Sequence, residues 1–267
     1  METRKRHPIL VIIPHGGYRI PAELADMAAV SDFDLFFQAD TSANEIFSFE
    51  NVAARIDTDI SRLCLDTDRR YDEISSPNRD GVIKKLTLYG KNVFREGAYP
   101  DEIAISNILK RYYFPFHETI EKIIGTGEIK LIIDCHTIMA VAPSASRESG
   151  RPRPMITLYN RAEVKNEAVT TCPDGACAEL LSLLEKNFYG EEWSAVEKFI
   201  VSESPSTGYV HRRYGASGIP MIRISLSKSL FLNEKYFDHS NLRIDASRIA
   251  DLKKKLWRAV ERLAGSL

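Results

Sequence analysis

Long hydrophobic runs are missing from this chain of 267 residues, and none approaches the roughly 20 apolar residues that span a bilayer. The first segment, METRKRHPILVIIP, has the basic-then-apolar order of a secretory signal, but its apolar run is only ILVII. No small-residue cleavage site follows, and Pro14-His15-Gly16-Gly17 ends the run. The segment therefore predicts the first core strand of a cytoplasmic protein, and no membrane partner is expected.

Cysteine and excess charge of one sign are also scarce. The chain has four cysteines and no CxxC pair, so neither a zinc ribbon nor a disulfide framework is indicated. They are Cys64, Cys135, Cys172 and Cys177. The formal net charge of -1 gives no polyanion-binding signature, so no nucleic acid partner is expected.

Aliphatic runs of strand length recur along the chain, separated by stretches of helical periodicity. The runs span 9–14, 62–66, 130–136, 155–160 and 219–226, and the helical stretches span 101–124, 176–188 and 246–264. Asp101 is placed to cap the first helix, and Pro115 should kink or split it. The alternation predicts an α/β protein with a mostly parallel or mixed sheet flanked by helices. Segments 72–100 and 141–154 are expected to be long loops.

Two of these strands end in a histidine. His15 follows the first strand and precedes two glycines that allow a sharp turn, while LIIDCHTIMA places Asp134 and His136 at the end of another strand. One interpretation of His136 is a hydrogen-bonded histidine at a strand end. The other is a metal ligand at the carboxyl edge of an open α/β sheet, where such folds place their sites.

A catalytic zinc ion needs three protein ligands and one open position, so a third ligand is required. The best remaining carboxylate is Asp40, in FFQADTSANEIF, whose alternative role is to cap a helix. The sequence SRLCLDTDRRYDE adds Arg62 and Arg69, which could bind a carboxylate in a forked geometry or belong to a solvated charge cluster.

Several motifs occur together in one order, and this order resembles the N-formylglutamate amidohydrolase family. They are PHGG, an SR dipeptide before D-x-x-R, YYFPFH, DCHT and GYVHRRYG, with GVIKKLTLYGKNVFREG and SLSKSLFLNE as further similar stretches. The similarity extends from about residue 9 to about residue 236. This family is a branch of the zinc carboxypeptidase and aspartoacylase-like hydrolases. The resemblance implies one zinc carboxypeptidase-like domain over 1–267, of the phosphorylase/hydrolase-like fold, and a hydrolase that removes an N-formyl or other N-acyl group from an amino acid.

The resemblance also implies roles for individual residues. His15, His136 and Asp40 would hold Zn²⁺, and Asp134 would orient a ligand histidine through its other nitrogen. The family pattern Asp-x-Asn-Arg grips the substrate carboxylate; here Arg69 is retained, but Asp68 replaces the amide, which should weaken binding of a dicarboxylic amino acid or change the substrate. The further anion contacts implied are Arg62 and Arg223.

A second departure concerns the general base. Relatives carry a glutamate in the strand before the S-[RK]-S-L-[YF] run, where this chain has Ser225. Glu203 is the nearest carboxylate that could substitute, with a surface loop acid as the alternative interpretation, and Tyr209 is the other predicted catalytic residue. His117 is expected to be structural, and His211 to line the substrate loop. Two rival functions remain: a metal- and anion-binding pseudoenzyme without the base, and a carboxypeptidase with a wider cleft.

Overall fold

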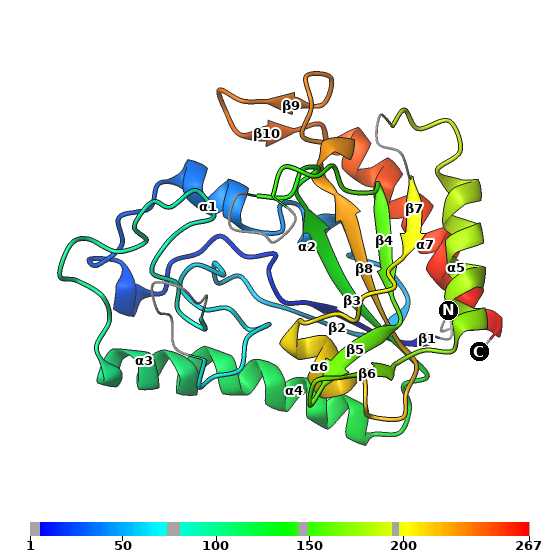
Figure 1. Ribbon diagram of the computed structural model, residues 1–267, viewed down its shortest axis with the longest axis horizontal. Coiled ribbons are helices and arrows are strands. Elements are labelled where there is room, and N and C mark those ends of the chain that lie inside the picture. The colour runs from blue at the N-terminus through cyan, green and yellow to red at the C-terminus, as the bar shows by residue number, and fades with distance from the viewer. Residues whose placement is uncertain (1–5, 74–80, 144–148, 194–197, 267) are drawn as a thin grey trace, which may run out of the picture.

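The computed structural model describes residues 6–73, 81–143, 149–193 and 198–266 and contains a six-stranded sheet in the order β2-β1-β3-β8-β4-β7 (Figure 1). Its strands are β1 (His7–Ile13), β2 (Val52–Asp57), β3 (Leu131–Ile138), β4 (Ile156–Tyr159), β7 (Phe199–Val201) and β8 (Met221–Ser227). Strands β2, β1, β3 and β8 are parallel, whereas β4 runs antiparallel to β8 and carries β7 in parallel on its other edge. The predicted α/β class with a mostly parallel, mixed sheet is confirmed.

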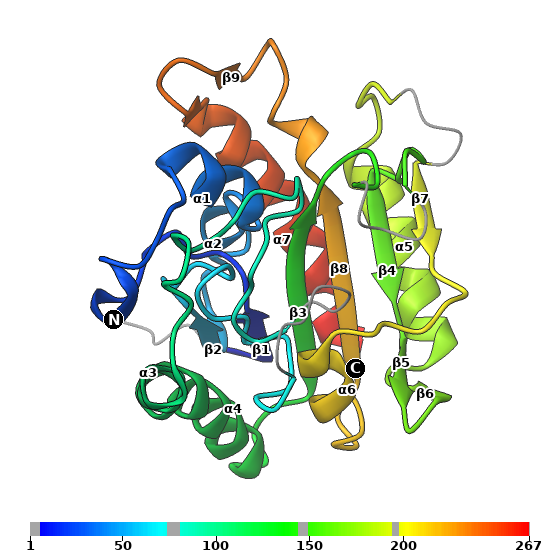
Figure 2. The same ribbon diagram turned by 60° about the vertical axis from the view of Figure 1, so that its left-hand side comes forward.

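Helices cover both faces of the sheet (Figures 1 and 2). One face packs on α2 (Ala43–Ile46), α5 (Asp174–Asn187) and α7 (Ala246–Ser266), and the other on α4 (Phe114–Gly125) and α6 (Tyr209–Tyr214). Because side chains alternate along a strand, β1 sends Ile9 and Val11 into the first core and Leu10 and Ile12 into the second. Burial on both faces explains why this strand is a continuous aliphatic run.

The remaining elements lie around this sheet. Helices α1 (Asp32–Gln38) and α3 (Glu102–Ile108) pack with long connecting segments around a separate apolar cluster. Two hairpins form separate two-stranded sheets outside the six-stranded one. They are β5 (Arg161–Val164) with β6 (Glu167–Thr170), and β9 (Phe237–Asp238) with β10 (Arg243–Ile244). Short 3-10 turns span Ala22–Leu24 and Lys228–Leu230. Within the described ranges, no helix is long and apolar enough to cross a membrane.

The predicted strand at 62–66 is wrong. The chain turns there, with the amides of Cys64 and Leu65 donating to the Ser61 carbonyl at 2.9 and 3.0 Å. Leu63, Cys64 and Leu65 are nevertheless buried, because they fill the separate apolar cluster rather than a sheet. Strands β2 and β7 lie at the two edges of the sheet, are only partly buried, and were not predicted.

The predicted helix over 101–124 is divided. Asp101 caps α3 by accepting from the Ala104 amide at 2.8 Å, as expected. A π-helical turn, Leu109–Tyr113, then separates α3 from α4, and Pro115 lies in the first turn of α4. Proline is tolerated there because the first amides of a helix need no partner within it. The described part of 72–100 contains only isolated bridges, such as Leu86 with Asn92, while 74–80 and 144–148 in the predicted loops lie outside the described residues.

Candidate functional site

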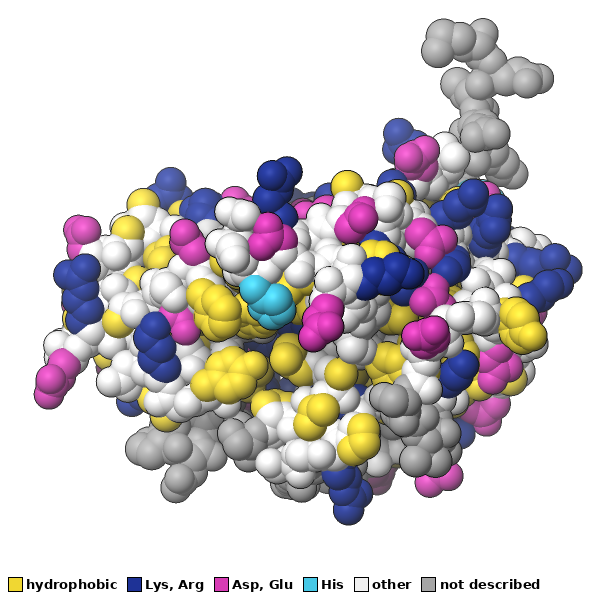
Figure 3. Space-filling view, turned by 90° about the horizontal axis from the view of Figure 1, so that it is seen from above, with side chains coloured by type: hydrophobic (Ala, Val, Ile, Leu, Met, Phe, Trp, Pro, Cys, Tyr) yellow, Lys and Arg dark blue, Asp and Glu magenta, His cyan; other side chains and the backbone are white. Residues whose placement is uncertain are grey.

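Three neighbouring parallel strands bring the candidate residues to one edge of the sheet. His15 follows β1, Asp134 and His136 lie on β3, and Ser225 on β8 pairs in register with His136. Since the carboxyl ends of parallel strands meet at the same edge, residues more than 200 positions apart in the sequence converge there. Seen from the top of Figure 1, hydrophobic side chains surround a hollow on this side of the molecule (Figure 3).

The two glycines after His15 serve close packing. A Cβ atom on Gly16 would lie 2.1 Å from the side-chain oxygen of Asn44, and one on Gly17 would lie 2.1 Å from the backbone of Asp59. Neither glycine has a positive φ angle. The expected sharp turn is therefore a close approach between segments, which holds His15 against the loop that carries Asp40.

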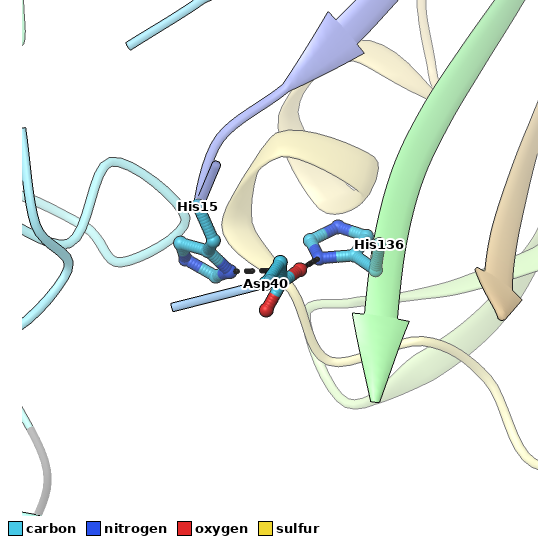
Figure 4. Close-up of side chains that lie close together, drawn as sticks. All are labelled: His15, Asp40 and His136. Carbon is cyan, nitrogen blue, oxygen red and sulfur yellow. Dashed lines mark hydrogen bonds and ion pairs between the residues drawn. The ribbon is translucent and has the colours of Figure 1, made fainter. Parts of the chain in front are cut away.

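His15, Asp40 and His136 form a compact buried group (Figure 4). Asp40 Oδ2 lies 2.8 Å from His136 Nδ1 and 3.7 Å from His15 Nδ1. One ligand atom from each residue can be chosen so that all three lie within 4.8 Å of one another. Asp40 precedes α2, but its side chain does not cap that helix, whose N-cap is Ser42. Its carboxylate instead faces the two imidazoles.

Each imidazole is oriented by a second carboxylate. His15 Nε2 lies 2.6 Å from Asp66 Oδ1, and His136 Nε2 lies 2.9 Å from Asp134 Oδ1. The contact predicted for Asp134 is present, and Asp66 makes the equivalent one. A histidine that donates through one ring nitrogen to a carboxylate presents the other nitrogen as a metal ligand. Both rings therefore turn Nδ1 toward Asp40.

A buried polar atom tests whether the group fits a metal ion. Within the described part of the chain, His15 Nδ1 is buried and has no hydrogen-bond partner. A buried acceptor without a partner is costly, and a cation at this position would satisfy it. Two imidazole nitrogens and one carboxylate oxygen are also a donor set that suits Zn²⁺. The residues fit such an ion.

Electrostatics hold the carboxylates ionised. Burial alone would raise the pKa of Asp40, but the neighbouring His136 and His15 hold that pKa well below its usual range. Burial and the Arg223 charge would lower the pKa of His136, but Asp134 and Asp40 outweigh them and raise it to about 9. A metal ion at this group would therefore have to displace a proton from His136, which makes its binding dependent on pH.

Three cations contact the acids of this group, and a fourth, Lys228, lies next to Asp40. Lys84 Nζ and Arg62 Nη2 lie 2.8 and 3.2 Å from Asp66 Oδ2. Arg223 contacts Asp68 and Asp134, and Lys228 Nζ donates to the carbonyls of Phe37 and Ala39, next to Asp40. Burial lowers the pKa of Lys228 to about 8, although Asp40 opposes this change. Lys84 and Lys228 were not predicted, because lysines within ordinary strand or loop sequence carry no spacing signal.

The structure brings together two of the three predicted substrate-binding arginines. Arg62 and Arg223 contact the acids around His15 and His136. Arg69 is half-buried and lies 3.9 Å from Glu73, while the Tyr113 hydroxyl donates to its carbonyl.

Among the described contacts, none joins either predicted catalytic residue to His15, Asp40 or His136. Glu203 is exposed in the bend after β7. Tyr209 begins α6; its amide donates to the Asp68 carbonyl and its ring lies 5.5 Å from that of His117.

The other two buried histidines have partners in the surrounding structure. His117 bridges the Tyr214 hydroxyl and the Thr67 carbonyl at 2.8 and 3.1 Å, in keeping with the structural role expected of it. His211 is buried against the Thr171 hydroxyl at 2.9 Å.

Comparisons with known proteins identify the family. A model of the N-formylglutamate amidohydrolase family matches residues 7–232, and a comparison with curated protein sequences found no relative. The crystal structure of N-formylglutamate amidohydrolase from Ralstonia eutropha JMP134 is 17% identical, covers 99% of this chain and 97% of that chain, and has a TM-score of 0.73. The crystal structure of a gene product from Agrobacterium tumefaciens is also 17% identical, with coverages of 97% and 92% and a TM-score of 0.60.

At this level of identity, the similarity to solved structures establishes the fold alone. The family match is independent of it and extends over nearly the same residues as the motifs found in the sequence. Since it also spans well over half of the chain, the chain belongs to the N-formylglutamate amidohydrolase family.

Proposed function

We propose that this protein is a zinc-dependent amidohydrolase that removes an N-formyl or other N-acyl group from an amino acid. One observation carries the proposal: two buried imidazoles turn Nδ1 toward a shared carboxylate, Asp40, while a separate acid holds the far nitrogen of each ring. In a chain of this family, that arrangement supports a metal centre of the hydrolytic type.

His15, Asp40 and His136 would hold the metal, which when bound supplies a Lewis acid for the scissile carbonyl and lowers the pKa of water. Asp66 and Asp134 fix the two rings. Arg69 is the proposed contact for the carboxylate of the substrate, with Arg62 and Arg223 close to the metal ligands. Glu203 and Tyr209 remain the proposed catalytic residues, and the exposed position of Glu203 requires that its loop close over the substrate.

A second function is favoured by the paired state of the acids. Asp40, Asp66, Asp68 and Asp134 each contact a histidine, lysine or arginine. The family resemblance also puts Ser225 where relatives carry a glutamate. General acid–base assistance typically contributes about a hundred- to ten-thousand-fold in rate. A chain without it would bind metal and substrate and hydrolyse the amide slowly, as a pseudoenzyme.

We further propose a cytoplasmic location and a small N-acyl amino acid as the partner. All four cysteines are free and buried, which fits a reducing compartment. Family membership supports a small amide substrate rather than a macromolecule.

Metal analysis combined with an assay of formate release tests this function. The purified chain should contain about one Zn²⁺, and the double variant His15→Ala/His136→Ala should contain none, while exposed His239→Ala serves as the control. Formate release from N-formyl amino acids would support the hydrolase. Zinc without release from any N-acyl amino acid tested would support the pseudoenzyme, and unchanged zinc in the double variant would refute the metal site.

A further inference from the structure

Arg223 is already neutralised by the protein itself. This side chain extends from β8, two residues before Ser225, and is 16% exposed. Its Nη1 atom lies 3.0 Å from Asp68 Oδ2 and 3.4 Å from Asp134 Oδ2. A partly buried cation held between two carboxylates has little attraction left for a third one.

Asp68 is fixed in this position by its surroundings. Its Oδ1 atom accepts from the Val210 amide at 2.7 Å, and its own amide donates to Asp66 Oδ1 at 3.0 Å. Gly208 leaves room for the pair, because a Cβ atom there would lie 1.9 Å from Arg223 Nη1 and 2.5 Å from Asp68 Oδ2. Asp68 therefore cannot swing away to expose Arg223 without losing its hydrogen bond to the Val210 amide in the first turn of α6.

The charges of the wider group lead to the same conclusion. Four carboxylates, Asp40, Asp66, Asp68 and Asp134, lie near four cations. Arg62, Lys84 and Arg223 contact these acids, and Lys228 binds the carbonyl of Ala39, next to Asp40. With a metal bound, both histidines would be neutral and these side-chain charges would cancel, so the divalent ion would leave a positive excess. That positive excess would attract one substrate carboxylate. A second carboxylate on the β8 side would approach Asp68 and Asp134 and be repelled by them.

We propose that Asp68 determines specificity: it cancels Arg223 and restricts the site to N-acyl amino acids with one carboxylate and an uncharged side chain. This inference rests on the proposed function and specifies its substrate class. Acidic side chains are excluded by repulsion, a means of discrimination that does not require extra attraction for the accepted substrate.

N-formylglutamine and N-formylglutamate are matched probes, because they differ only in an amide against a carboxylate. The wild type should show at least about tenfold higher kcat/KM for N-formylglutamine. Asp68→Asn keeps the size of the side chain and an acceptor for the Val210 amide while it removes the charge. It should shift the ratio toward N-formylglutamate by roughly ten- to a hundredfold. Asp101→Asn, at the cap of α3, should leave the ratio unchanged.

Calorimetric binding of glutamine and glutamate, the amino-acid products, provides a readout that does not depend on hydrolysis. Preferential binding of glutamine by the wild type, reduced in Asp68→Asn, would support the inference even if neither amide were cleaved. Binding preference without cleavage would refute the proposed hydrolase activity but not the proposed specificity. Equal or stronger recognition of the glutamate compounds by the wild type would overturn the inference, whether or not the variant folds, and so would an unchanged ratio in folded Asp68→Asn.

Discussion

Ser225 lies beside His136 in the sheet, and its neighbour on the other side is Thr157 of β4. Strand alternation places the Ser225 side chain on the same face as Arg223, whose guanidinium reaches the acid that orients His136. A longer side chain at position 225 would thus extend toward the metal ligands. A serine hydroxyl cannot accept a proton at neutral pH, but a carboxylate can.

We expect Ser225→Glu to raise amide hydrolysis by roughly ten- to a thousandfold, within the usual range of general-base assistance. Zinc content must be measured with the rate, because a new carboxylate could also ligate the ion and close its open position. The control is Ser227→Glu, the same substitution two residues further along β8, at a buried position beyond His136. A Ser225→Glu variant that retains zinc and gains no activity would show that this position does not supply the base.

Asp66 is the residue through which His15 is oriented. Asp66→Asn should reduce metal affinity by roughly ten- to a hundredfold, because an amide oxygen can accept from His15 Nε2 but lacks the charge that makes the ring a stronger ligand. Competition with a chelator would measure this loss, and Asp59→Asn, an exposed acid that pairs with Arg19, is the control. Unchanged metal retention would leave Asp66 as a structural partner of Lys84 and Arg62 alone.

The candidate site could be predicted from the sequence only in part. His15 and His136 were recognisable because a histidine directly after an aliphatic run is unusual, and Asp134 stands in the same motif. Lys84 reaches Asp66, and Lys228 reaches the carbonyl next to Asp40, from distant segments, and nothing in their local sequence indicates burial. Asp66 was visible as part of D-x-x-R, but its contact with His15 depends on a turn that places residue 66 beside residue 15.

At the scale of secondary structure, the central strands were predictable and the edges were not. β1, β3 and β8 are largely buried and rich in aliphatic residues, whereas β2 carries Arg55 and Asp57 within its six residues. The run at 62–66 has the composition of a buried strand, yet its apolar side chains fill a separate cluster around Tyr113. Composition reports burial in that case and not backbone conformation.

The π-helical turn also follows from tertiary structure. It lies between α3, which packs in the separate cluster, and α4, which covers the sheet. Tyr113, at the end of this turn, is fully buried and donates to the Arg69 carbonyl at 2.8 Å. Helical periodicity alone would have continued one regular helix through these residues, because the packing partners of the two halves are not visible in the local sequence.

For the whole molecule, buried histidines contribute to the response to acid. Burial, assisted by the Arg213 charge, lowers the pKa of His117 to about 4, from 6.5 in the unfolded chain. Between these values the unfolded state binds a proton that the folded state does not, so stability is present above pH 6.5 and is lost as the pH falls to about 4. The shift corresponds to roughly 3 kcal/mol of unfolding free energy.

Denaturant unfolding at several pH values tests this prediction. His117→Gln should be less stable at neutral pH, since two hydrogen bonds are altered, but its stability should fall less steeply between pH 6.5 and 4. Part of the slope should remain, because burial also lowers the pKa of His211 to about 4. Exposed His239→Gln should follow the wild-type curve, and a His117→Gln curve parallel to it would contradict this assignment.

The strand order has a consequence for the synthesis of the protein on the ribosome. β8 lies between β3 and β4 in the sheet, yet it begins at Met221, after every other strand of this sheet has been made. Until β8 emerges, no strand pairing joins β4 and β7 to the rest of the sheet, and β3 keeps an unpaired edge. All three proposed metal ligands are translated long before that moment. The nascent chain therefore carries its metal-binding residues beside an open β edge of the kind that pairs with other chains, and insertion of its last central strand removes that hazard.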